Sequence, residues 1–296
     1  MSSLIGLLIA AIGAVSKSFS EILSKRNFLD DVDVYVNSWA LRFFAIPFLL
    51  IALIATGGIP EIEKEFYYSL AISAPIGISA TVLYMKALDA GDISLISPIS
   101  GLSPLLLLIT TPLIVNEFPS ALGLVGVMIA TLGVYLLEVN KASANDVLQP
   151  FKSLFSNPGA KYILLVVILY SVSAPVDKIA VEASSPIMYT LALHIVIAAA
   201  LTPMMIYKNG YETLPKIKKD IKWVSAVGAL SGLASLLQMI ALTYTLVVYV
   251  IAVKKCGIII SVVYGSYKFD EPYTMQRIIA SAVMIVGIIV ISISLA

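Results

Sequence analysis

Apolar runs of about 20 residues, separated by short polar breaks, recur along the whole chain. The stretch from Gly91 to Leu137 shows the pattern, with two such runs divided by Asn116-Glu117-Phe118-Pro119. A helix of about 20 residues crosses the hydrocarbon core of a bilayer. Only 12% of the residues are charged, which is about half the share in a soluble domain. The sequence therefore predicts an all-α membrane protein with ten transmembrane helices, at 4–24, 35–56, 67–88, 93–115, 120–138, 161–181, 187–207, 223–243, 247–267 and 277–295.

The two halves of the chain resemble each other. Shifted by 152 to 154 positions, four parts of the first half fall on matching parts of the second: 40–43 on 192–195, 80–88 on 234–242, Glu117 on Glu271, and Gly133 on Gly287. Four matches in one order at nearly one offset indicate an internal duplication.

The duplication predicts a first repeat over 1–139, a linker over 140–160 and a second repeat over 161–296. Five spans per repeat is an odd number, so the second repeat enters the membrane from the opposite side. The expected fold is two inverted five-helix repeats, an arrangement that many transporters share, with a binding site near the midplane.

The orientation in the membrane is expected to follow the loop charges. The odd-numbered connections hold nearly all the loop lysines and arginines, whereas the even-numbered connections and both tails hold only Lys64. Cytoplasmic loops are enriched in these residues. The charges therefore predict that both termini lie outside.

Ionisable side chains inside predicted spans are costly and need a partner, water or a role. Lys17 and Glu21 share one helical face with several serines, and they either line a cavity or form a local ion pair. Arg42 either bonds backbone carbonyls in the helix packing or binds an anion. His194 takes the matching place in the second half, where it is either a neutral packed histidine or a group that couples proton movement to transport.

Lys254 and Lys255 lie well within the ninth predicted span and give the strongest signal. Adjacent helix positions point about 100° apart, so the two side chains cannot share one narrow face. They are expected to bind a carboxylate or phosphate as point charges. The alternative is an ion pair with Asp177 or Glu21. Asp177 itself is either that counter-ion or an acceptor for a proton or cation.

Several uncharged residues complete the expected site and its moving parts. Gly228, Ser231, Gly232, Ser235 and Gln238 form a small and polar ridge that predicts close helix packing, with Gln238 as its candidate for a substrate hydrogen bond. Prolines inside spans free backbone carbonyls and weaken helices. The expected pocket residues are Tyr84, Ser100, Gln238 and Tyr264, and the expected helix breaks are at Pro98, Pro104 and Pro175.

Other classes of function have no support in the sequence. It contains no P-loop, no HExxH, no dinucleotide fingerprint and no cysteine cluster. One cysteine and one histidine make an internal disulfide impossible and a histidine-built metal site implausible. We expect no enzymatic activity, no cofactor, no metal and no nucleic-acid partner. The expected partners are the lipid bilayer of the cell membrane and a small-molecule substrate, for a monomer or homodimer.

Two motifs resemble a known family. Lys-Ala-Leu-x-x-Gly-Asp-x-Ser-Leu-Ile-Ser-Pro-Ile-Ser-x-Leu-Ser-Pro, at 86–104, and the glycine-rich run at 122–136 resemble the EamA-type repeat of the drug/metabolite transporter superfamily. The second half departs from the motif at Thr243-Tyr244 and at Cys256-Gly257-Ile258. The resemblance implies a ten-helix secondary transporter with a central cavity, often an exporter of amino acids, metabolites or drugs. It also implies that both termini lie inside, which differs from the charge-based expectation.

The leading hypothesis is a secondary active transporter that works by alternating access and exports a small metabolite such as an amino acid or organic anion. The paired lysines also resemble the basic pair of organophosphate translocators, so an anion exchanger is the alternative. A scaffold protein or a lipid-modifying enzyme is the alternative from another class. A scaffold would tolerate loss of the lysines within the spans, and an enzyme would need clustered catalytic groups.

Overall fold

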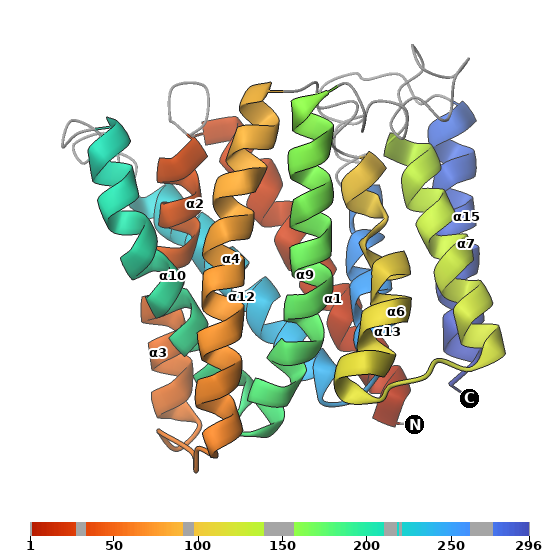
Figure 1. Cartoon of the computed structure of the whole chain (residues 1–296), viewed down its shortest axis with the longest axis horizontal. Coiled ribbons are helices and arrows are strands. Elements are labelled where there is room, and N and C mark those ends of the chain that lie inside the picture. Colours follow the sequence, from red (N-terminus) through yellow and green to blue (C-terminus); the bar gives the residue numbers. More distant parts are fainter. Residues whose placement is uncertain are drawn as a thin grey trace.

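The chain forms a bundle of roughly parallel and antiparallel helices (Figure 1). The structure is a computed structural model that describes residues 2–27, 34–90, 98–138, 157–209, 218, 221–260 and 275–295, and these residues contain helices and turns but no strand. The helices are α1 (Ser2–Asn27), α2 (Val34–Phe43), α3 (Ile46–Ala55), α4 (Lys64–Ala90), α6 (Ser103–Val115), α7 (Ala121–Glu138), α9 (Pro158–Glu182), α10 (Pro186–Asn209), α12 (Ile221–Leu242), α13 (Val247–Lys255) and α15 (Met275–Ile293).

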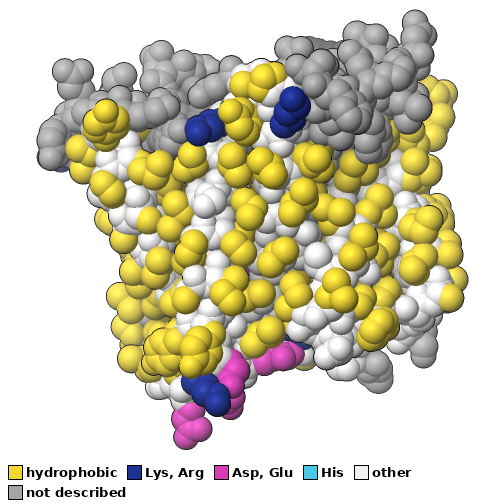
Figure 2. Space-filling model, viewed as in Figure 1, with side chains coloured by type: hydrophobic (Ala, Val, Ile, Leu, Met, Phe, Trp, Pro, Cys, Tyr) yellow, Lys and Arg dark blue, Asp and Glu magenta, His cyan; other side chains and the backbone are white. Residues whose placement is uncertain are grey.

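Length and hydropathy confirm the membrane fold. Within the described residues, eight helical segments are long and apolar enough to cross a bilayer, and Ala121–Leu137 is a shorter apolar helix. The visible face of the bundle is covered by apolar side chains, and the charged side chains lie near its two ends (Figure 2). This distribution suits a protein whose middle faces lipid. The predicted span 247–267 contains α13, and its residues beyond 260 lie outside the described part.

The helices pair as two inverted repeats should. The first helix of the first half, α1, starts at the end of the bundle that holds both termini, whereas α9, the first of the second half, starts at the opposite end (Figure 1). Helix α4 packs along α9, and its counterpart in the repeat, α12, packs along α1. The last helices of the two halves, α7 and α15, pack on each other. The contacts therefore follow an approximate two-fold relation between the halves.

The predicted span 35–56 is not one continuous helix. It turns at Phe44-Ala45, between α2 and α3, and Pro47 lies in the first turn of α3. Proline has no backbone N–H to donate to the preceding turn, so the helical hydrogen bonding is interrupted there. The turn packs on α12, where a Cβ added to Gly228 would lie 2.5 Å from the Phe44 Cβ. This contact confirms that the ridge on α12 serves close packing.

The fourth and ninth spans are both interrupted, and the two interruptions correspond. A turn at Leu102 precedes α6, and α13 ends at Lys255, before a turn at Cys256-Gly257. Leu102 and Cys256 are 154 positions apart, which is the offset of the duplication. Pro104 lies in the first turn of α6. The N–H groups of a first turn have no partner within the helix, so proline loses no hydrogen bond there. The interruption of the fourth span thus lies just before Pro104.

Pro175 does not break its helix, contrary to the expectation from the sequence. Helix α9 continues through it from Pro158 to Glu182. Proline cannot bond the carbonyl of the residue four positions earlier, which here is Ser171. The hydroxyl of Thr110, on α6, donates to that carbonyl at 2.7 Å. The freed acceptor is thus satisfied by a neighbouring helix, as the hydrocarbon environment requires.

Glycines bring α7 and α15 into backbone contact. A Cβ added to Gly287 would lie 2.4 Å from the backbone nitrogen of Ala130, and one added to Gly133 would lie 2.7 Å from that of Met284. Such approaches are possible only for residues without a side chain. The small residues of α7 are therefore packing residues.

Replacing Gly287 by leucine is expected to force α7 and α15 apart. Overpacking of a tight contact costs at least about 1–3 kcal/mol of unfolding free energy, so the melting temperature in detergent should fall clearly. Ile289→Leu, on the exposed side of the same helix, is the control and should leave the melting temperature nearly unchanged. An unchanged melting temperature for Gly287→Leu would contradict the described contact.

Candidate functional site

The interior side of α1 carries a charged pair. Ile5, Leu8, Ile12, Val15 and Phe19 form an exposed apolar stripe on one side of this helix. Lys17 and Glu21 fall on the opposite side at helical spacing, and their charged atoms lie 3.5 Å apart, as expected for an i,i+4 pair. Their side chains are 48% and 56% exposed. The pair therefore borders solvent-accessible space inside the bundle.

Three serines of α1 fix the direction of this pair. Ser16 and Ser20 donate to the carbonyls of Leu230 and Val227 on α12. Ser18 donates to the carbonyl of Gly257, beyond the end of α13, at 2.8 Å. Seen down the axis of α1, Lys17 and Glu21 lie between the side of the helix that contacts α12 and the side that contacts Gly257. The charged pair thus points between α12 and α13.

Lys254 and Lys255 occupy the last turn of α13. The ammonium of Lys254 donates to Oε1 of Gln238 on α12, so two expected site residues meet. Lys254 also interacts electrostatically with Lys17, Lys255 and Arg42, and with Glu21. Lys17, Arg42, Lys254 and Lys255 are hereafter the cationic cluster. Its members come from α1, α2 and α13, and therefore from both halves.

Lys254 is not paired directly with a carboxylate of the described residues. Lys17, Arg42 and Lys255 repel its ammonium group, and Glu21 and Asp177 attract it. The hydrogen bond of Lys254 goes to an amide oxygen, not to either carboxylate. Cations enclosed by helices are costly without compensation. The arrangement is therefore suited to binding an anion from solution.

Two tyrosines lie beside this charged region. Tyr84 on α4 and Tyr170 on α9 both interact electrostatically with Lys17. Their side chains are 40% and 42% exposed. Tyr84 is an expected pocket residue, whereas Tyr170 carries no signal in the sequence beyond its place in a span.

Asp177 is held by hydroxyl groups. The hydroxyl of Tyr189, on α10, donates to Oδ1 of Asp177 at 2.5 Å, and that of Ser173 donates to the same oxygen at 3.3 Å. Asp177 is 6% exposed. The interaction with Lys254 is electrostatic and acts over a distance. The expected ion pair between Asp177 and a lysine of the ninth span is therefore not the arrangement found.

His194 is fully buried on α10 and makes one hydrogen bond, between Nδ1 and the carbonyl of Thr190 at 2.8 Å. Because a carbonyl only accepts, Nδ1 carries the hydrogen. Nε2 has no hydrogen-bond partner. The geometry is that of a neutral imidazole packed in the core.

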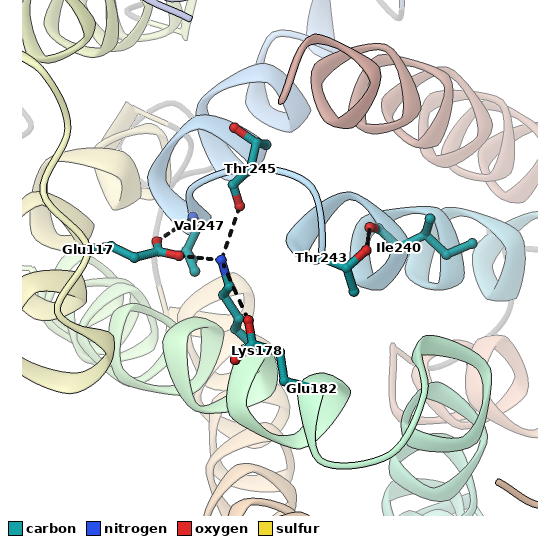
Figure 3. A network of polar contacts seen from close by, with 7 residues as sticks. All are labelled: Glu117, Lys178, Glu182, Ile240, Thr243, Thr245 and Val247. Carbon is teal, nitrogen blue, oxygen red and sulfur yellow. Dashed lines mark hydrogen bonds and ion pairs between the residues drawn. The ribbon is translucent and has the colours of Figure 1, made fainter. Parts of the chain in front are cut away.

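A polar network joins the two halves (Figure 3), beside a pocket that residues near both termini, Ser3 and Ser294, help to line. Lys178 on α9 forms an ion pair with Glu117, which lies between α6 and α7, and donates to the carbonyl of Thr245 at 3.4 Å. The other oxygen of Glu117 accepts from the backbone N–H of Val247 at 2.8 Å. Glu117 therefore caps the N-terminus of α13, whose first N–H groups have no partner within the helix.

This network is nearly enclosed by protein. The side chains of Lys178 and Glu117 are 14% and 10% exposed, whereas Glu182, 3.9 Å from Lys178, is 58% exposed. An open pocket adjoins the network and is lined by Ser3, Ser120, Tyr244 and Tyr249, among others. The sequence alone gives no sign that Glu117 pairs with Lys178.

The remaining expected residues are placed as follows. Ser100 is half-buried in the short helical turn that starts at the buried Pro98. It matches Lys254 at the offset of 154 positions. Tyr264 lies outside the described residues. Among the residues that are described, no three histidine, cysteine, aspartate or glutamate side chains are grouped so that they could hold a metal ion.

Comparisons with known proteins agree with this architecture. A crystal structure described only as that of a protein superposes with a TM-score of 0.76 at 14% sequence identity, covering 99% of this chain and 96% of the other. At that identity the likeness concerns the fold alone. No curated protein sequence matches the chain. The sequence profile of the EamA-like transporter family matches twice, at residues 4–139 and 157–293. The chain therefore belongs to the EamA-like transporter family, a group of membrane transporters, and it carries the family's repeat in each half.

Proposed function

We propose that this transporter moves a small anionic metabolite by alternating access, and that the cationic cluster binds the anion. The observation that carries the proposal is that the ammonium of Lys254, among helices of the two halves, donates to the amide oxygen of Gln238 and not to a carboxylate of the described residues. An amino acid or organic acid would supply the carboxylate. Export, which the resemblance implies, remains a prediction about direction.

The interrupted helices support this choice of site. In transporters with inverted repeats, discontinuous helices near the midplane commonly form the substrate site. Here α13 ends at the two lysines and packs on α6, which begins just after its own interruption. The positive end of a helix dipole at the start of α6 favours a negative charge nearby. The side chain of Ser103, in its first turn, is buried without a hydrogen-bond partner.

Each proposed residue has a distinct role. Lys254 and Lys255 contact the negative group as point charges. Gln238, which now accepts from Lys254, and the hydroxyl of Tyr84 offer hydrogen bonds to the rest of the substrate. Ser100, the counterpart of Lys254 in the first half, offers a further hydroxyl to the substrate. The interruption before α6 and that after α13 act as hinges for the rocking of the halves.

The substrate class can be tested by thermal stability in detergent with panels of amino acids, organic acids, organic phosphates and cationic drugs. A ligand that binds the folded state stabilises it by about 2.7 kcal/mol at a concentration of 100 times its dissociation constant. We expect anions to raise the melting temperature and cationic drugs to leave it unchanged. Stabilisation by cations alone would refute the proposal.

Exchange of organic phosphates is the second candidate, because two adjacent lysines end α13. A dianionic phosphate engages two ammonium groups better than a carboxylate does. In the same panels, stabilisation by organic phosphates and not by carboxylates would select this alternative.

A further inference from the structure

Asp177 is a buried carboxylate that anion binding at the cationic cluster does not use directly. It lies on α9 one turn from Ser173, and its side chain is enclosed by α4 and α10. The neighbouring Lys178 is already paired with Glu117. Among the described residues, Asp177 therefore has hydroxyl partners but no cation within hydrogen-bond distance.

The hydroxyl groups around Asp177 can serve both of its protonation states. Ionised, the carboxylate accepts from Tyr189 and Ser173. Protonated, it needs an acceptor for its own hydrogen. Ser73 on α4 is 1% exposed and lies beside both Asp177 and Tyr189. Its oxygen is a ready acceptor for that hydrogen.

The direct hydrogen bond between Tyr189 and Asp177 suits a proton. The hydroxyl of Tyr189 donates to the Asp177 carboxylate at 2.5 Å. A proton that binds the carboxylate needs no further space in this buried site.

We propose that Asp177 is the proton-binding site of this transporter, and that proton binding there and anion binding at the cationic cluster favour each other. The inference rests on the proposed anion transport. Among the described charged groups, Lys254 on α13 is the one that acts on Asp177, and Tyr189 on α10 is its titratable neighbour. Neutralising Asp177 removes a negative charge that partly compensates Lys254, so the site attracts an anion more strongly. By linkage, a bound anion holds the proton with the same coupling free energy.

This linkage is the one that co-transport of a proton and an anion requires. Water on one side delivers the proton to the carboxylate, and the carboxyl releases it to water on the other side after the halves have rocked. Such a pair can leave the cell down the gradient of the anion, so the inference is compatible with export.

Infrared difference spectroscopy of the protein in lipid nanodiscs tests the proton site without any transported substrate. Lowering the pH from about 8 to about 5 should produce the C=O stretching band of a protonated carboxyl in a poorly hydrated environment. Asp177→Asn should lack this band, because its amide cannot be protonated there, while its oxygen still accepts from Tyr189. Glu65→Gln, at an exposed position of α4, is the control and should keep the band assigned to Asp177.

Superimposable spectra of the wild type and Asp177→Asn would overturn the proton site. Tyr189→Phe provides a second test, because it removes one donated hydrogen bond and should shift the frequency of the band without abolishing it. An unshifted band would likewise contradict the inference. These outcomes can be told apart from a failure of the proposed function. A missing band would overturn the proton site and leave the proposed anion binding intact. If no anion binds, the proposed function fails, whether or not the band is seen.

Discussion

Lys254→Met is expected to raise the dissociation constant of the stabilising anion at least about 30-fold, because removing one partner of an enclosed charge contact costs about 2–5 kcal/mol. The ammonium lies among helices from both halves and donates to Gln238. Methionine keeps most of the side-chain volume, so helix packing is retained. Calorimetric titration of the purified protein gives the dissociation constant directly.

The matched control is Lys161→Met, at an exposed position near the start of α9. It removes the same charge from the chain without touching the cationic cluster, and it should bind like the wild type. Equal weakening by both variants would indicate a general charge effect. Unchanged affinity in Lys254→Met would remove this residue from the binding site.

The second large effect is expected at the Glu117–Lys178 ion pair. Lys178→Met should lower the free energy of unfolding by about 3–5 kcal/mol, because it leaves the Glu117 carboxylate enclosed and without its cation. Both side chains are nearly buried. The same change should loosen the contact between α9 and the start of α13 (Figure 3).

Adding Glu117→Gln to Lys178→Met should restore much of the lost stability. Glutamine removes the uncompensated charge and still offers an oxygen to the Val247 N–H. Glu182→Gln is the control, since its exposed pair with Lys178 is worth about 0–1 kcal/mol. Thermal or denaturant unfolding in detergent measures all three. A single Lys178→Met variant as stable as the wild type would show that the pair does not hold this contact together.

Hydropathy and the repeat suffice to predict the helical membrane fold, since they reflect the thickness of the bilayer and the duplication itself. Where the helices are interrupted is harder to predict. Pro47 and Pro175 are both prolines within predicted spans, yet the helix is interrupted near Pro47 and continues through Pro175. The difference depends on neighbouring helices: glycines of α12 admit the turn, and Thr110 satisfies the carbonyl freed by Pro175.

The candidate site is predictable in part for a similar reason. Charges inside apolar spans are rare, so Lys254, Lys17 and Arg42 are visible in the sequence. Their grouping depends on how α1, α2 and α13 meet. The contacts of Asp177 with Tyr189 and of Glu117 with Lys178 join residues 12 and 61 positions apart. No local pattern predicts such pairs, because the fold alone brings them together.

Flux through the reconstituted protein tests the central claim most directly. Proteoliposomes containing the wild type, Lys254→Met or Lys161→Met would be loaded with the anion that stabilises the protein most, and counterflow of the radiolabelled anion would be followed. The account predicts saturable counterflow for the wild type and Lys161→Met, and a background rate for Lys254→Met. Counterflow at the wild-type rate in Lys254→Met would contradict transport through the cationic cluster.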